Sequence, residues 1–202
     1  MTIAVPNKLQ QLDDAQSRIL NLGCGNTREK DRCNEAGDPI VMWWHTDVEH
    51  TPTVDQVVDM NRALPWPEGY WNRIYACHSL EHVPFWKQCL EECHRILKPM
   101  GTLDIRVPDI EEAIRMYLTR EESPYWWDNP VTGEHERIDW RHLMYGDKVD
   151  TAKHRGHCHG FSWDTGREDN DLALILEGIG FRSIEKKSRG SSDFEIWAVA
   201  TK

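Results

Sequence analysis

Short runs rich in apolar residues alternate along the chain with stretches of helical periodicity. Strands are predicted at residues 18–22, 41–47, 53–59, 72–77 and 102–107; the first stops at a glycine turn, and the second and third end in an acid. In residues 84–97 and 110–119 the apolar positions repeat at the spacing of an amphipathic helix. Strands that alternate with helices in this way form a parallel sheet, so the pattern predicts an α/β fold.

The ends of the chain depart from this alternation. Residues 1–17 are predicted to form an N-terminal cap with a short polar helix. Residues 120–166 are rich in Trp, His, Gly and charge and have weak periodicity, which indicates a substrate-side insertion or lid. A helix at 169–179 and two alternating strands at 181–187 and 194–200 would close the sheet as an antiparallel pair. Because there is no internal repeat, residues 1–202 are expected to form a single domain.

Charge and cysteine usage narrow the function classes. The 202 residues include 24 Lys and Arg against 34 Asp and Glu, a net charge of −10 that argues against a nucleic-acid partner. No run reaches the about 18 apolar residues of a membrane span, and the first residues lack the plan of a signal peptide. The six cysteines form no CxxC pair, which indicates reduced thiols and a cytoplasmic location.

Candidate chemistry begins where the first predicted strand ends, at Gly23-Cys24-Gly25. Glycines there allow the backbone to approach a ligand closely, and a helix after such a turn would supply free N–H donors at its N-terminus. Asp47 ends the next strand, where doubly wound folds place an acid on ribose hydroxyls. Asp59 ends the third predicted strand and could accept a hydrogen bond from adenine, with Met60 packing on the ring.

Five segments in order carry a family resemblance. They are ILNLGCGN, the acid at Asp47, VVDMNRALPWP, IYACHSLEHV and CHRILKPMGTLDIRVPD. Together they resemble the class I S-adenosylmethionine-dependent methyltransferases, and most of all the type-11 group and its small predicted-methyltransferase relatives. The resemblance covers residues 18–110. It implies a Rossmann-like, doubly wound, mostly parallel sheet with an antiparallel C-terminal strand pair, and S-adenosyl-L-methionine as the cofactor.

The resemblance also places a cofactor site. It implies the methionine end at Asn21, Gly23, Cys24 and Gly25, the ribose at Asp47 and Val48, the adenine at Asp59 and Met60, and the sulfonium beside Cys77 and His78. Glu81 and His82 match a signature whose usual role is structural. The chain departs from the family at Asn21 and Thr27, where an acid and a third glycine are common, so the contact to the methionine amino group is expected to be weaker.

A histidine-rich stretch lies beyond the segments that carry the resemblance. His154, His157, Cys158 and His159 have no standard zinc spacing, so no metal is expected. The stretch is interpreted either as an exposed loop or as a wall of the acceptor site. In the second case His157 or His159, with His78 behind them, would remove a proton from the acceptor, since an ordinary histidine pKa of about 6.5 suits that task.

The predicted activity is methyl transfer from S-adenosylmethionine to an oxygen or nitrogen atom of a small molecule or glycan. Trp126 and Trp127 could offer a flat surface to a sugar or aromatic ring, or could form the core of the lid. Two alternatives stay open: a non-catalytic cofactor-binding module or partner subunit, and a protein or nucleic-acid methyltransferase. A dinucleotide reductase is disfavoured because Arg28 stands where its fingerprint has a third glycine. The pattern indicates no oligomeric state.

Overall fold

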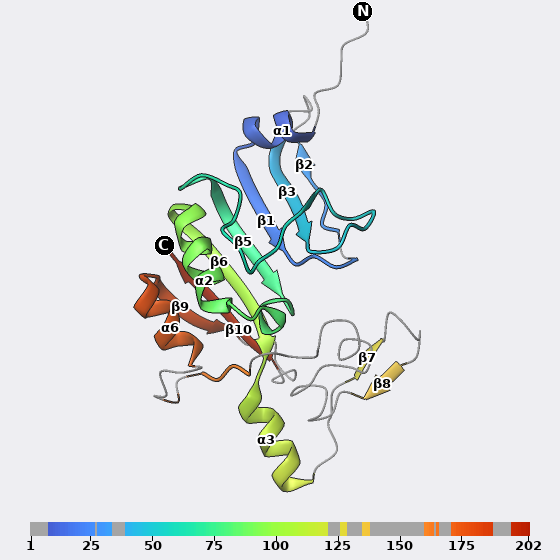
Figure 1. Ribbon diagram of the computed structural model, residues 1–202, viewed down its shortest axis with the longest axis vertical. Coiled ribbons are helices and arrows are strands. Elements are labelled where there is room, and N and C mark those ends of the chain that lie inside the picture. The colour runs from blue at the N-terminus through green and yellow to red at the C-terminus, as the bar shows by residue number, and fades with distance from the viewer. Residues whose placement is uncertain are drawn as a thin grey trace, which may run out of the picture.

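The computed structural model describes residues 8–26, 28–33, 39–120, 126–128, 135–137, 160–163, 165, 171–187 and 195–202. Its main sheet contains β1 (Ser17–Leu22), β2 (Arg32–Cys33), β3 (Pro39–Asp47), β4 (Gln56–Val57), β5 (Trp71–Cys77), β6 (Leu97–Pro108), β9 (Arg182–Lys187) and β10 (Glu195–Thr201). The helices are α1 (Lys8–Asp14), the 3-10 turn η1 (Leu80–His82), α2 (Trp86–Ile96), α3 (Ile110–Thr119) and α6 (Leu172–Ile179). Figure 1 shows α3 projecting from one end of this sheet, and the small hairpin of β7 (Trp126–Asp128) and β8 (His135–Arg137) toward the same end.

The order of the strands is that of a doubly wound sheet. It runs β2-β3-β1-β5-β6-β10-β9, and β4 pairs with β3. The pairs β1–β3, β1–β5, β5–β6 and β3–β4 are parallel. β10 is antiparallel to both β6 and β9, and β2 is antiparallel to β3. The predicted Rossmann-like fold with an antiparallel C-terminal strand pair is thereby confirmed.

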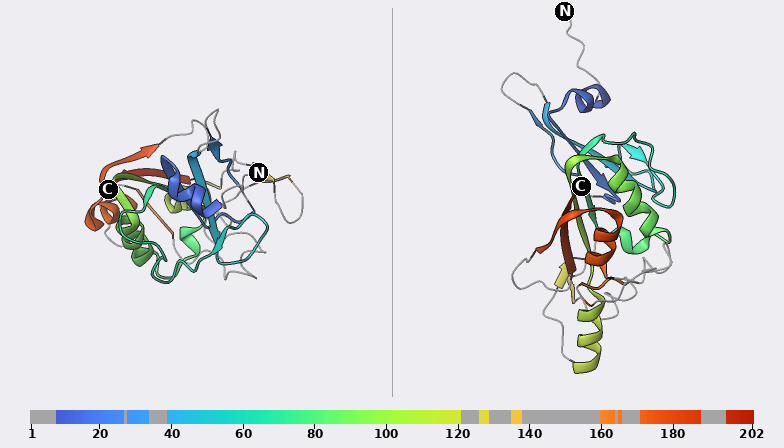
Figure 2. Two further views of the ribbon diagram at one scale, coloured as in Figure 1. Left: turned by 90° about the horizontal axis from the view of Figure 1, so that it is seen from above. Right: turned by 90° about the vertical axis from the view of Figure 1, so that its left-hand side faces the viewer.

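The core lies on one face of the sheet. Leu20, Ile74, Leu103 and Ala200 stand in register on β1, β5, β6 and β10, and all four are buried. The helices α2 and α6 lie over this face, as the right-hand view of Figure 2 shows. In α2 the buried residues recur at the spacing predicted from the sequence: Trp86, Cys89, Leu90, Cys93 and Ile96. Burial of these apolar side chains is the main favourable contribution to folding.

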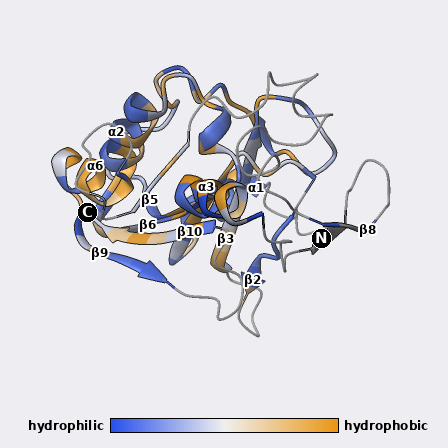
Figure 3. Cartoon of the chain, turned by 90° about the horizontal axis from the view of Figure 1, so that it is seen from below, coloured by the Kyte–Doolittle hydropathy of each residue, from blue (hydrophilic) through white to orange (hydrophobic). Residues whose placement is uncertain are grey.

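The other face of the sheet is polar and aromatic. Arg106 on β6 places its guanidinium 4.4 Å from the ring centre of Trp197 on β10 and 5.5 Å from that of Tyr75 on β5. Such a cation over aromatic rings is attracted by the negative face of each ring. The mixture of colours on the strands in Figure 3 reflects the alternation of apolar and polar side chains along them.

Two local predictions are wrong. The strand expected at 53–59 is reduced to β4, because Thr53 and Asp55 direct their polar groups to β3 and to the glycine turn. The helix expected after the glycine turn does not form in residues 28–33, where irregular chain leads into β2.

The helix predicted at 110–119 is found at those bounds, with the Asp109 side chain capping its first N–H groups.

Of the predicted lid at 120–166, the structure describes Arg120, 126–128, 135–137, 160–163 and residue 165. None of the helices among the described residues is long and apolar enough to cross a membrane.

Candidate functional site

The site residues stand at the carboxyl ends of neighbouring parallel strands. Gly23 follows β1, Asp47 ends β3 and His78 follows β5. β1 lies between β3 and β5, so the three strand ends are adjacent along one edge of the sheet (Figure 1). This edge is where open α/β sheets bind their ligands.

Gly23 is required by close packing. Its φ is +76°, and a Cβ atom there would lie 2.4 Å from the Cβ of Ser79 and 3.3 Å from the Cε of Met60. Ser79 also donates a hydrogen bond of 3.0 Å from its hydroxyl to the carbonyl of Leu22. The N–H groups of Gly23 and Cys24 donate to the carbonyl of Thr46, at 2.9 and 2.8 Å. The turn is thus fixed between β3 and the β5–η1 connection.

Gly25 has the open surroundings that a ligand needs. Its φ is +54°, and a Cβ atom built on it meets nothing within 4 Å. Its carbonyl accepts hydrogen bonds from the hydroxyls of Thr53, at 2.8 Å, and Thr51, at 3.3 Å. Its N–H donates to Oδ2 of Asp47 across 2.9 Å. The turn therefore presents bare backbone to open space beside a carboxylate, which fits a cofactor that carries hydroxyl and amino groups.

Asp47 retains capacity to bind hydroxyl groups. Oδ2 accepts the N–H of Gly25, and Oδ1 accepts the N–H of Glu49 at 3.1 Å. A carboxylate has about four lone-pair sites, so about two remain for two adjacent hydroxyls. Val48, next to it, is exposed.

Asp59 and Met60 come close to the same turn. The N–H of Val58 donates to the carbonyl of Asp47 across 2.9 Å, which brings this segment beside β3. Oδ1 of Asp59 accepts from the backbone and side-chain nitrogens of Asn61, at 2.9 and 3.1 Å. These bonds, helped by Arg62, lower the pKa of Asp59 against the opposing effect of burial. Met60 is partly buried against the core.

Three further predicted residues lie around the turn. Asn21 is buried, and its carbonyl accepts the hydroxyl of Thr46 at 3.1 Å. Burial, with the nearby charge of Asp47, raises the pKa of Cys24, so this thiol stays protonated at neutral pH and is no nucleophile. Cys77 is half-buried at the end of β5.

His78 sits in a strained position between two carboxylates. Its φ is +50°, uncommon for a residue other than glycine, and its N–H donates to the carbonyl of Arg106 at 2.9 Å. Ring atom Nε2 is 2.9 Å from Oε2 of Glu195, and Nδ1 is 3.5 Å from Oε1 of Glu81. Burial opposes the charged ring, but the two carboxylates outweigh it and raise the pKa of His78 to about 10.

This environment favours an imidazolium at neutral pH. The His78 side chain is 40% exposed, so solvent screens part of the attraction, but the direction of the change is set by two carboxylates whose side chains are 1% and 5% exposed. An imidazolium has no lone pair with which to remove a proton. The geometry of His78 therefore suits an orienting charge better than the proton-accepting role predicted from the sequence.

Sequence reasoning missed Glu195, which comes from the last strand. It reaches His78 because β10 runs antiparallel to β6 and places Glu195 opposite Pro108, at the carboxyl end of β6. No local motif marks it. For Glu81 the predicted structural role fits its burial in η1, but its proximity to His78 was not foreseen.

His154, His157 and His159 lie outside the described residues, as do the side chains of Trp126 and Trp127. Their predicted roles stay predictions. Among the residues that the structure describes, no group of three or more His, Cys, Asp or Glu could hold a metal ion.

Comparisons with known proteins agree with this fold. Residues 20–105 match the model of a family described as a methyltransferase domain. A solved S-adenosylmethionine-dependent methyltransferase from Mesorhizobium loti is 16% identical, with a TM-score of 0.55 over 94% of this chain and 92% of that one. A Thermotoga maritima methyltransferase, described as a possible histamine N-methyltransferase, is 14% identical, with a TM-score of 0.51 over 96% and 89% of the two chains. No curated protein matches the chain.

At these identities the two structures show the fold alone, and the family match indicates the activity. The match covers the segment from β1 to β6 that carries the glycine turn, Asp47, Asp59 and His78. Residues 20–105 therefore belong to a methyltransferase domain, and the comparisons support a class I S-adenosylmethionine-dependent enzyme with S-adenosyl-L-methionine as its cofactor.

Proposed function

We propose that this methyltransferase transfers the methyl group to an oxygen or nitrogen atom of a small molecule or glycan. The observation that carries the proposal is the charge of the acceptor side of the site. Beyond the glycine turn, the end of β5 presents His78 between Glu81 and Glu195, which together bear a net charge of −1 when the ring is protonated. The whole chain carries −10. Both charges disfavour a polyanionic acceptor.

The proposal includes a division of roles along the sheet edge. Gly25 would face the methionine end of the cofactor, Asp47 would accept the ribose hydroxyls, and Asp59 with Met60 would face the adenine. When bound, S-adenosylmethionine supplies a methyl group already activated by its sulfonium. The protein therefore has to hold both partners in line and exclude water.

Proton removal from the acceptor is assigned to the His157–His159 segment. A neutral acceptor atom must lose its proton during the transfer, and an imidazole of ordinary pKa suits that step. His78, held as a cation by Glu81 and Glu195, would orient groups at the end of β5 instead of accepting the proton.

We extend the proposal to the organisation of the chain. Residues 1–202 would act as one domain, with residues 1–17 as an N-terminal cap. The segment 120–166 would close over the acceptor, with Trp126 and Trp127 available to stack on a ring. A cytoplasmic location remains the prediction from cysteine usage.

The test is the release of S-adenosylhomocysteine by the purified protein with pooled acceptors. One set of reactions contains small amines, phenols, hydroxy acids and oligosaccharides, and a parallel set contains RNA, DNA and proteins. We expect turnover in the first set, lost in Asp47→Ala. We also expect it to fall by at least about tenfold in His157→Ala or His159→Ala, the lower part of the range for general-base catalysis. Release of S-adenosylhomocysteine only in the set that contains RNA, DNA and proteins would overturn the proposed acceptor class.

A further inference from the structure

The glycine turn of this chain has unusual support. Doubly wound folds usually follow the glycine turn with a helix, which holds the loop and directs its N–H groups at the ligand. Here the described residues after the turn, 28–33, contain no helix. Something else must hold Gly25, Arg28 and Glu29 in place.

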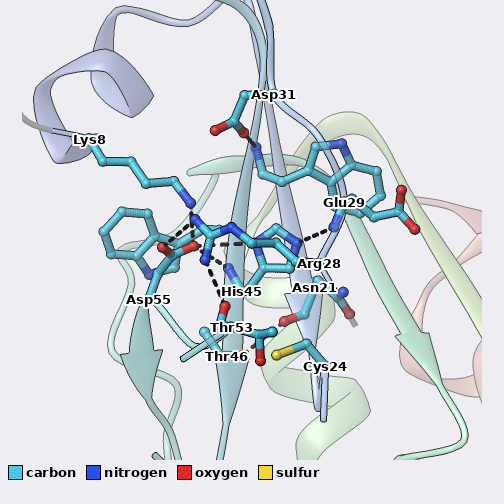
Figure 4. A network of polar contacts seen from close by, with 12 residues as sticks. Lys8, Asn21, Cys24, Arg28, Glu29, Asp31, His45, Thr46, Thr53 and Asp55 are labelled. Atoms are coloured by element: carbon cyan, nitrogen blue, oxygen red, sulfur yellow. Dashed lines mark hydrogen bonds and ion pairs between the residues drawn. The ribbon is translucent and has the colours of Figure 1, made fainter. Parts of the chain in front are cut away.

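The first support is a buried histidine on β3. The ring of His45 is fully buried, and its Nε2 accepts the backbone N–H of Glu29 across 2.9 Å. Because Nε2 is the acceptor, the ring proton of the neutral histidine is on Nδ1, which faces Oδ2 of Asp55 at 3.3 Å. His45 thus links the loop to Asp55, as Figure 4 shows.

The second support is Asp55 itself, in the connection before β4. Its carboxylate is 10% exposed and receives the backbone N–H of His45 at 3.0 Å and the guanidinium of Arg28 at 3.1 Å. Lys8 of α1 forms an ion pair with it as well. Although burial acts in the opposite direction, the ring and backbone N–H of His45 and the ammonium of Lys8 lower the pKa of Asp55 well below its usual range, so it is a fixed anion at neutral pH.

The third support runs from the same connection to both ends of the loop. Arg28 donates a second hydrogen bond, of 2.8 Å, to the carbonyl of Thr53. The hydroxyl of Thr53 in turn donates to the carbonyl of Gly25, also across 2.8 Å. Gly25 and Arg28 are therefore bound to one short segment, residues 53–55, which contacts β3 through His45 (Figure 4).

We infer that Asp55 is a positioning residue for the cofactor: through Arg28 and His45 it holds the Gly25–Glu29 loop in the form that accepts S-adenosylmethionine, in place of a helix. The inference rests on the proposed role of Gly25 and Asp47 in cofactor binding. Asp55 itself faces Arg28, His45 and Lys8, so it acts on the cofactor only through the loop.

The test measures cofactor binding and loop order, neither of which needs an acceptor. Arg28→Met removes the hydrogen bonds from Arg28 to Asp55 and Thr53. Because the Arg28 side chain is 40% exposed, the variant is expected to fold. Asp55→Asn keeps the shape of the carboxylate but not its charge. We expect the Kd for S-adenosylmethionine and for S-adenosylhomocysteine to rise about tenfold in both variants, equivalent to about 1.4 kcal/mol.

Two readouts separate positioning from general stability. Hydrogen exchange of the ligand-free protein should speed up at the Glu29 amide in Asp55→Asn, with core amides of β5 unchanged. Arg115→Met is the matched control, because it removes an arginine–carboxylate pair on α3 that is just as exposed on the surface. Its Kd should equal that of the wild type.

The outcomes distinguish this inference from the proposed function. A folded wild type that binds no S-adenosylmethionine would overturn the cofactor site itself. Wild-type binding combined with wild-type affinity in Arg28→Met and Asp55→Asn would leave the site intact and overturn the role of Asp55. A lower melting temperature in these variants without a change in Kd would also overturn it, since Asp55 would then be purely structural.

Discussion

The carboxylate of Asp104 on β6 accepts a hydrogen bond of 2.8 Å from the indole Nε1 of Trp197 on β10. Its other oxygen pairs with the guanidinium of Arg73 on β5. Asp104 is almost completely buried, so it joins three adjacent strands on the polar face of the sheet. An acid with two partners in this position ties the parallel half of the sheet to its antiparallel edge.

We expect Asp104→Ala to lower the free energy of unfolding by about 2 kcal/mol, because the indole N–H of Trp197 and the guanidinium of Arg73 lose the buried carboxylate that pairs with them. Asp104→Asn should lose less, since its amide oxygen can still accept from Trp197. Urea unfolding monitored by tryptophan fluorescence gives both values. An alanine variant as stable as the wild type would show that this pair contributes nothing.

The two glycines of the turn should respond differently to alanine. At Gly23 a Cβ atom would meet Ser79 at 2.4 Å, so Gly23→Ala is expected to destabilise the fold by several kcal/mol, about the cost of overpacking plus a left-handed residue. At Gly25 the Cβ atom meets nothing, so Gly25→Ala should cost only about 1 kcal/mol.

Cofactor binding should be strongly weakened by Gly25→Ala, although this variant costs little stability. Its new methyl group would occupy the space in which we place the ligand, so Gly25→Ala should fold but bind S-adenosylmethionine at least about tenfold more weakly. Thermal unfolding and calorimetric titration measure the two effects separately. Unchanged affinity in Gly25→Ala would move the ligand away from this turn.

His78 predicts a pH dependence of stability. Its pKa is raised from 6.5 to about 10 in the folded protein by Glu195 and Glu81, against the effect of burial. The folded state therefore holds the proton more tightly, and this contribution is fully present below pH 6.5 and is lost as the pH rises through about 10. The advantage in melting temperature of the wild type over His78→Gln should shrink steadily from pH 6.5 to pH 10.

The check on this assignment is direct. An NMR titration of the His78 ring should show it still protonated at pH 8. A midpoint near 6.5 would contradict the paired carboxylates and would restore His78 as a candidate proton acceptor.

The sequence predicted the elements whose burial is regular. The strand ending at Leu22, the strand ending at Cys77 and the helix from Ile110 have clean apolar spacing and a clear terminator, and each was found close to its predicted bounds. Asp47 was found at the end of its predicted strand, where the fold places ligand-facing groups, whereas Asp59 lies two residues beyond β4. The doubly wound, mostly parallel sheet with its antiparallel C-terminal pair followed from the family resemblance.

The remaining features depend on contacts between distant parts of the chain. Glu195 meets His78 only because of the register of β10 on β6, and Asp55 reaches Arg28 across an irregular connection. Neither pair leaves a local pattern in the sequence. The helix expected after Gly25 was wrong because His45 and Asp55 hold that loop by polar contacts, which a hydrophobic periodicity cannot reveal.

The central claim is that S-adenosylmethionine binds at the edge formed by Gly25 and Asp47. Calorimetric titration of the wild type beside Asp47→Ala tests it most directly, with circular dichroism to confirm that both are folded. The account predicts micromolar binding by the wild type, about −8 kcal/mol, and no measurable binding by Asp47→Ala. Equal binding by the two proteins, or none by the folded wild type, would contradict it.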